Sequence, residues 1–160
     1  MKRIVGVADM FVSDNTDDTI ITYALGSCLG IAVYDPLTQV GGLLHTMLPE
    51  SAVDPHKAKE KPLMFVDTGV PLLFRACYAL GAIKHNIQVK VAGGASIKTD
   101  SEDDFFQIGK RNVIMLRKLL WKNNIMITAC DVGGHQSRTM SLSIATGTVV
   151  VRTNGLEKIL

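Results

Sequence analysis

The sequence predicts an α+β fold in which packed mixed β-sheets are flanked by two main helices. Seven or eight short runs rich in β-branched and aromatic residues are typical of strands, whereas only two segments have helical periodicity. Both helical segments lie mid-chain and do not alternate strictly with strands, which argues against a doubly wound parallel sheet. The 160 residues, 47% of them hydrophobic and 20% charged, are enough for a single domain spanning residues 1–160.

The expected elements follow in chain order. In the first half, strands are predicted at residues 4–12, 19–25, 29–34 and 40–48, followed by a loop at 50–61. A helix is predicted from Asp67 or Thr68, either of which can cap it, to about residue 84. Further strands are predicted at 87–92, 125–132, 138–144 and 148–152, with a second helix at 112–123.

The third and fourth strands are predicted to form a β-hairpin, because the intervening Asp-Pro-Leu-Thr-Gln is typical of a turn. A loop of residues 36–39 would place Gly30 opposite His45. Opposed residues in an antiparallel pair share a sheet face, as do residues two apart on one strand. Cys28 is therefore expected diagonally next to His45, about 7–8 Å away between backbones. A slip of one residue would separate the pair.

A thiol beside an imidazole is the usual composition of an activated sulfur nucleophile. The imidazole accepts the proton, and the ion pair is expected to lower the thiol pKa from about 8.5 toward neutrality. Gly26 and Gly30 leave room for a substrate carbonyl, and the N–H groups near Cys28, from Ser27 and Leu29, are candidates for an oxyanion hole. The alternative is that Cys28 is an ordinary buried cysteine.

Thr22 lies on the strand just before the Cys28 loop. Its hydroxyl is expected to hydrogen-bond the second ring nitrogen of His45 and so fix the tautomer. The sequence equally allows a threonine that only favours β structure and makes local contacts.

The remaining candidate side chains are assigned structural or solvated positions. Two cysteines, Cys77 and Cys130, are expected in the core. Three histidines, His56, His85 and His135, are expected near solvent, the last in a Gly-rich surface turn. Three carboxylates, Asp14, Asp17 and Asp18, do not match a calcium loop and are expected in a solvated loop. No CxxC or HxxxH spacing occurs, so neither a metal nor a cofactor is expected.

Composition restricts the partners and the compartment. A net charge of +2 with scattered cations argues against nucleic-acid binding. No apolar stretch approaches the ~20 residues that span a bilayer, so membrane insertion is not expected. Three widely spaced cysteines do not form a disulfide framework, which favours a reducing, cytoplasmic location.

Five ordered blocks of the sequence resemble the CheD family of chemoreceptor glutamine deamidases. They are GSCLG at 26–30, HTMLP at 45–49, VAGGA at 91–95, IGKRN at 108–112 and DVGG at 131–134, within a resemblance that spans about residues 6–151. The resemblance implies a catalytic cysteine at Cys28, a catalytic histidine at His45 and a histidine-orienting threonine at Thr22. It also implies packed mixed sheets flanked by helices.

The resemblance further implies an activity and partners. The activity is removal of ammonia from glutamines on the cytoplasmic helices of methyl-accepting chemoreceptors, with hydrolysis of receptor glutamyl methyl esters in some members. A CheC-type phosphatase is the implied partner. Two alternatives stay open: a non-catalytic module that regulates such a phosphatase through the same surface, and a general cysteine peptidase or small-molecule amidase. No substrate-binding residue is assigned, in the loop at 50–61 or elsewhere.

Overall fold

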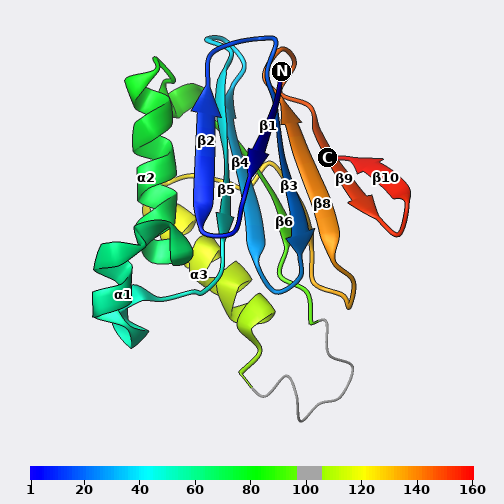
Figure 1. Cartoon of the computed structure of the whole chain (residues 1–160). Coiled ribbons are helices and arrows are strands. Elements are labelled where there is room, and N and C mark those ends of the chain that lie inside the picture. The colour runs from blue at the N-terminus through cyan, green and yellow to red at the C-terminus, as the bar shows by residue number, and fades with distance from the viewer. Residues whose placement is uncertain (97–105) are drawn as a thin grey trace.

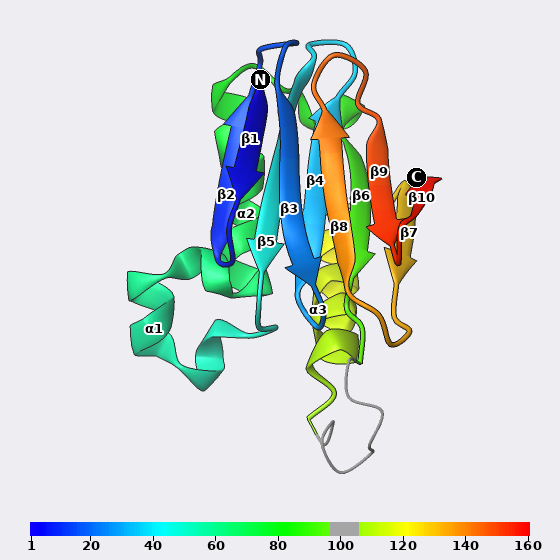
Figure 2. The same ribbon diagram turned by 45° about the vertical axis from the view of Figure 1, so that its right-hand side comes forward.

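The structure, a computed structural model, describes residues 1–96 and 106–160 and confirms the predicted α+β class (Figure 1). One five-stranded sheet has the order β1-β3-β8-β9-β10 and the other β2-β5-β4-β6-β7. Figure 2 shows the first sheet in front of the second, with the main helices behind both. The described residues thus form three layers, and the second sheet is the middle one.

The elements have the following bounds. The strands are β1 (Lys2–Val5), β2 (Asp9–Ser13), β3 (Thr19–Leu25), β4 (Leu29–Asp35), β5 (Val40–Thr46), β6 (Gln88–Gly93), β7 (Ala129–Val132), β8 (Arg138–Ser143), β9 (Val149–Thr153) and β10 (Leu156–Ile159). The helices are α1 (Pro55–Glu60), α2 (Val66–Ala79) and α3 (Ile108–Lys122), with short 3-10 turns at Ser51–Val53, Pro62–Met64 and Lys84–Asn86. None of the helices within the described ranges has the length and apolar character that crossing a bilayer requires.

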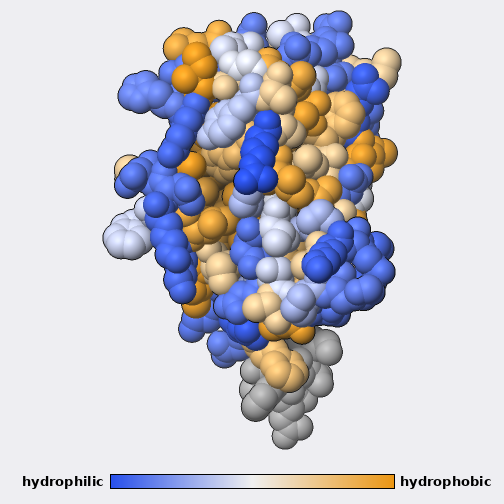
Figure 3. All heavy atoms as spheres, turned by 90° about the vertical axis from the view of Figure 1, so that its left-hand side faces the viewer, coloured by the Kyte–Doolittle hydropathy of each residue, from blue (hydrophilic) through white to orange (hydrophobic). Residues whose placement is uncertain are grey.

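The middle sheet has a hydrophobic core on each face. On β5, Leu43 packs between the two sheets, whereas its neighbour Leu44 packs against the helix layer. Every residue of β4 and β5 is buried, so both strands are mostly apolar without alternation, and their buried polar residues Asp35, His45 and Thr46 stand at the strand ends. The helix layer has apolar side chains between hydrophilic ones (Figure 3), and a groove of about 270 Å³ between α2 and α3 is lined by Val70, Phe74 and Leu119 among others.

The predicted strand at 4–12 is wrong, because the chain changes sheet within it. β1 pairs with β3 in the first sheet, whereas β2 pairs with β5 in the second. The crossing occurs at residues 6–8, where Ala8 has a positive φ of 56° and its N–H donates to the His45 carbonyl. An apolar pattern does not show which sheet a strand joins, so the sequence did not reveal this crossing.

The loop predicted at 50–61 is also wrong, since it contains α1. Asp54 caps this helix by accepting from the Lys57 N–H, and Pro55 occupies its first position. The predicted caps of the next helix have other roles. Asp67 accepts hydrogen bonds from the Ser51 N–H and hydroxyl, and the Thr68 hydroxyl donates to the Pro62 carbonyl.

Other boundaries differ from expectation. The first main helix ends at Ala79, the second begins at Ile108 instead of residue 112, and the strand expected at 125–132 begins at Ala129. β10 was not predicted. Its four residues are all exposed, so its sequence has no alternation of buried and exposed residues that would indicate a strand. Cys77 is buried as expected, and burial raises the pKa of its thiol to about 12. Cys130 is exposed, contrary to prediction, because β7 is an edge strand.

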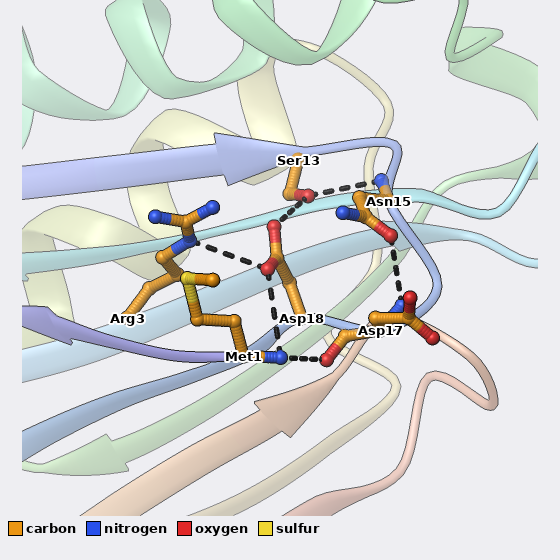
Figure 4. A network of polar contacts seen from close by, with 6 residues as sticks. All are labelled: Met1, Arg3, Ser13, Asn15, Asp17 and Asp18. Atoms are coloured by element: carbon orange, nitrogen blue, oxygen red, sulfur yellow. Dashed lines mark hydrogen bonds and ion pairs between the residues drawn. The ribbon is translucent and has the colours of Figure 1, made fainter.

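Asp18 does not lie in a solvated loop as predicted but is buried, with 3% of its surface exposed. Figure 4 shows its carboxylate between the Ser13 hydroxyl, which donates at 2.6 Å, and the Arg3 guanidinium at 3.2 Å. The terminal ammonium of Met1 lies 3.8 Å from the same carboxylate and donates to the Asp17 carbonyl. These contacts lower the Asp18 pKa, the Ser13 hydrogen bond most strongly. The network joins the start of β1 to the end of β2.

Candidate active site

The β4–β5 hairpin has the register that its loop length predicts. Gly30 lies opposite His45 and Asp35 opposite Val40. The Asp35 carboxylate accepts hydrogen bonds from the N–H groups of Leu37 and Thr38, which holds the turn in this register. His45 is therefore fixed at the end of β5, close to the loop that carries Cys28.

Cys28 lies in the loop between β3 and β4, at the end of the sandwich where β5 and the first turn of α3 also lie (Figure 2). It is partly exposed and packs against the cluster of side chains between the two sheets. An added side chain at Gly30 would meet Met140 and Leu25 of the opposing sheet, so Gly30 faces the same space. Cys28 is thus at the rim of the inter-sheet seam, where solvent can reach it.

Thr22 and His45 are hydrogen-bonded across that seam. Both are fully buried, and the Thr22 Oγ1 lies 2.7 Å from the His45 Nδ1. The Thr22 hydroxyl donates its only proton to the Val5 carbonyl at 2.8 Å. It therefore accepts from the Nδ1–H, which leaves the Nε2 of His45 with a lone pair. This Nε2 is buried and has no hydrogen-bond partner among the described residues.

Burial determines the charge states of the proposed pair. Desolvation raises the pKa of the Cys28 thiol above its ordinary value of 9.0, although the residue's own backbone N–H opposes the rise. Desolvation also lowers the His45 pKa below 6.5. Burial thus favours the neutral thiol and the neutral imidazole over the expected ion pair. The reason is that the two groups are desolvated without being hydrogen-bonded to each other.

Three consecutive carbonyls of the Cys28 loop point into the protein. The Gly26 carbonyl accepts from the Ala95 N–H, the Cys28 carbonyl from the Gly94 N–H, and the Ser27 carbonyl from the Asn112 side chain, each at 2.9 Å. In a trans peptide the C=O and the following N–H point in opposite directions, and the described residues contain no cis bond. The amides that follow these carbonyls thus point away from β6 and α3.

Among these amides, those of Ser27 and Cys28 donate to no other residue that the structure describes. Leu29, the other predicted donor, is the first residue of β4 and is in register with Thr46 and Gly93. The Ser27 amide and the Cys28 amide, which otherwise acts only on its own thiol, are the candidate donors to a negative oxygen.

The loop lies directly on the glycine turn at the end of β6. A Cβ added to Gly93 would lie 2.1 Å from the Cys28 carbonyl oxygen, and Gly93 has φ +111°. Only glycine permits both this approach and this backbone conformation. The positive φ of both Gly93 and Gly94 makes this segment a tight turn.

Sequence analysis did not assign a role to two further buried polar residues near the site. Asn112 follows the helical period of the buried Leu116 and Leu120, so a polar residue on an apolar face was the available signal. Arg138 donates to the Gly93 carbonyl at 3.2 Å and pairs with Asp131 at 3.4 Å. Arg138 lies 45 positions from Gly93 in the sequence, and no sequence pattern indicated that the two residues are in contact. His56, His85 and His135 are exposed, as expected.

Comparison with known proteins places the chain in a family. The family described as CheD chemotactic sensory transduction matches residues 47–153. A probable chemoreceptor glutamine deamidase CheD 1 of Syntrophus aciditrophicus is 55% identical over 95% of this chain and 94% of its own length. A similarly named protein of Solibacter usitatus is 45% identical over 97% of this chain and 90% of its own length. Another, of Thermococcus kodakarensis, is 41% identical over 95% of this chain and 92% of its own length. The family match begins after His45, but these relatives extend over nearly the whole chain. Their similarity and the family match agree with the five sequence blocks, and the chain belongs to the CheD family.

Proposed function

We propose that this protein deamidates glutamine side chains of chemoreceptors through a thioester on Cys28. The observation that carries the proposal is the buried His45 ring, whose Nδ1 is occupied by Thr22 and whose Nε2 is unpaired. A base with this tautomer, in the hairpin that follows directly on a partly exposed thiol, is suited to nucleophilic catalysis. The names of the curated relatives support the substrate class.

In the first half of the reaction, His45 acts as a general base. Its Nε2 takes the thiol proton while the Cys28 sulfur forms a bond to the carboxamide carbon of glutamine. Because burial favours the neutral form of both groups, we expect proton transfer to accompany attack. The amides of Ser27 and Cys28 stabilise the oxyanion. The carbon–nitrogen bond then breaks, and protonated His45 gives its proton to the leaving ammonia.

In the second half, water hydrolyses the thioester. His45 removes a proton from the water, hydroxide adds to the thioester carbon, and the sulfur leaves to regain its proton from His45. The product is glutamate, so a neutral receptor side chain becomes negative. Added like charges on neighbouring helices repel each other and can bias a signalling equilibrium. A glutamyl methyl ester would follow the same route, with methanol as the leaving group.

Mass spectrometry of a chemoreceptor cytoplasmic fragment tests this function. Incubation with the wild-type protein should convert specific glutamines to glutamate, a mass increase of about 1 Da per site, and Cys28→Ala should abolish the conversion. Cys130→Ala is the matched control, because that cysteine is exposed on an edge strand. Conversion that persists in Cys28→Ala would refute the mechanism. Absence of conversion by the wild type would favour the non-catalytic alternative, in which the surface serves only to bind a CheC-type phosphatase.

A further inference from the structure

One buried side chain of α3 connects the Cys28 loop to the residue that directly follows the strand carrying His45. The Nδ2 of Asn112 donates to the Ser27 carbonyl and to the Met47 carbonyl, both at 2.9 Å. Asn112 is fully buried, and its own Oδ1 has no partner among the described residues. A buried acceptor without a partner destabilises the folded chain. The carboxamide is therefore oriented by its two donated hydrogen bonds despite this cost.

The bond to Ser27 determines where the Cys28 amide points. The Ser27 carbonyl and the Cys28 N–H belong to the same planar trans peptide, so they are antiparallel. While Asn112 holds the carbonyl against α3, the Cys28 N–H must point away from α3, toward the open side of the loop. The flanking carbonyls of Gly26 and Cys28 are fixed by backbone amides. The Ser27–Cys28 peptide is thus the one in this run whose orientation depends on a side chain.

We propose that Asn112 is a positioning residue that keeps the Ser27–Cys28 peptide from flipping and so holds the Cys28 N–H in the oxyanion hole. Without Asn112, a peptide flip would turn the Ser27 carbonyl toward the substrate oxygen and the N–H away from it. The carbonyl would then repel the negative charge that the N–H stabilises. The inference rests on the proposed function only in giving this amide its role in acyl transfer.

Two reactions of the same sulfur separate this role from a general effect on the thiol. Acylation by p-nitrophenyl acetate passes through a tetrahedral oxyanion: the sulfur bonds to the acetyl carbon and p-nitrophenolate leaves. Alkylation by iodoacetamide is a displacement at a saturated carbon, in which iodide leaves and no oxyanion forms. Loss of an oxyanion donor should therefore slow only acylation. Neither reagent requires a chemoreceptor.

The experiment compares Asn112→Ala with Asn123→Ala in a Cys130→Ala background, which removes the exposed thiol. Asn123 is a matched control, because its Nδ2 also donates to a backbone carbonyl of α3, that of Leu119, but far from the loop. We expect Asn112→Ala to slow the p-nitrophenolate burst by at least about tenfold and to change the alkylation rate less than about twofold. Asn123→Ala should change neither rate.

Two results would overturn the inference. If both rates of Asn112→Ala match those of the control, Asn112 does not position the amide. If both rates fall together, Asn112 supports the thiol and imidazole in general. Asn112→Leu, which keeps most of the volume without a donor, replaces the alanine variant if that variant does not fold. A wild-type protein that gives a burst but leaves receptor glutamines unchanged would contradict the proposed substrate and not the role of Asn112.

Discussion

At the scale of single residues, the Thr22 hydroxyl determines which ring nitrogen of His45 can act as a base. Thr22→Val keeps the shape but leaves the Nδ1–H and the Val5 carbonyl without partners, so the ring can take the other tautomer. A penalty of about 1–3 kcal/mol for such unpaired groups corresponds to roughly a tenfold to hundredfold loss of kcat. Receptor deamidation by Thr22→Val and by Thr22→Ser, which keeps the hydroxyl, provides the measurement. Equal loss in both variants would mean that the methyl group matters and the hydrogen bond does not.

A neutral resting state of Cys28 and His45 would have a measurable pH signature. Because the thiol pKa is above 9.0, the rate of iodoacetamide alkylation should still be rising with pH at that value. Because the His45 pKa is below 6.5, its base form persists below that pH, and kcat/KM for deamidation should fall only on further acidification. Both profiles are to be measured in the Cys130→Ala background. An alkylation rate that is constant between about pH 6 and 8 would instead indicate a preformed thiolate–imidazolium pair.

At the scale of elements, the sequence predicted the features that depend on residues close together in the chain. The turn after Asp35 fixed the hairpin register, so the pairing of Gly30 with His45 followed from loop length alone. The Thr22 contact was predicted only as one of two equal alternatives, because it joins two sheets whose packing the sequence does not show. The Asn112 contacts join residues 65 and 85 positions apart and were not foreseen. Long-range partners of buried polar groups depend on tertiary packing, which periodicity does not encode.

The contact between the Cys28 loop and the β6 turn can be tested with two glycines. Gly93→Ala adds a methyl group that meets the Cys28 carbonyl, whereas Gly133→Ala adds one that meets no atom within 4 Å. Both glycines have positive φ, +111° and +86°, so both variants have backbone strain of about 1–2 kcal/mol. Only Gly93→Ala must also displace the loop, and we expect it alone to lose at least about tenfold in the p-nitrophenyl acetate burst. Urea unfolding measures the strain separately, and equal bursts from the two variants would exclude the contact as a determinant of activity.

At the scale of the whole molecule, the site is assembled from all three layers. The first sheet provides Thr22, the middle sheet provides His45, and α3 provides Asn112 to the loop that carries Cys28. Because these groups come from different layers, their geometry depends on how the layers pack. The middle sheet is buried on both faces and keeps that packing fixed. Deamidation should therefore decline together with global unfolding, and not before it.

Two buried carboxylates that join elements should make the fold sensitive to acid. Burial disfavours the ionised form of Asp35, but hydrogen bonds from the N–H groups of Ile83, Leu37 and Thr38 outweigh that cost and lower the Asp35 pKa. At Asp18, the Ser13 hydroxyl and the Arg3 guanidinium lower the pKa. Both carboxylates have pKa values in the folded protein below the ordinary 3.8, so on acidification the unfolded chain binds protons first. The stabilisation from these two groups is therefore complete above about pH 4 to 5 and is lost as the pH falls through their folded pKa values.

Urea unfolding at pH 6 and pH 3 measures this effect through the change in midpoint. Asp18→Asn should lower the midpoint at pH 6 and reduce the further drop at pH 3, because it removes one of the two titrating groups that stabilise the fold. Asp14→Asn, on the exposed loop before Asp18, is the control and should show the wild-type drop. If Asp18→Asn retains the full wild-type drop, then the contacts that join β1 to β2 at Asp18 do not contribute to acid sensitivity.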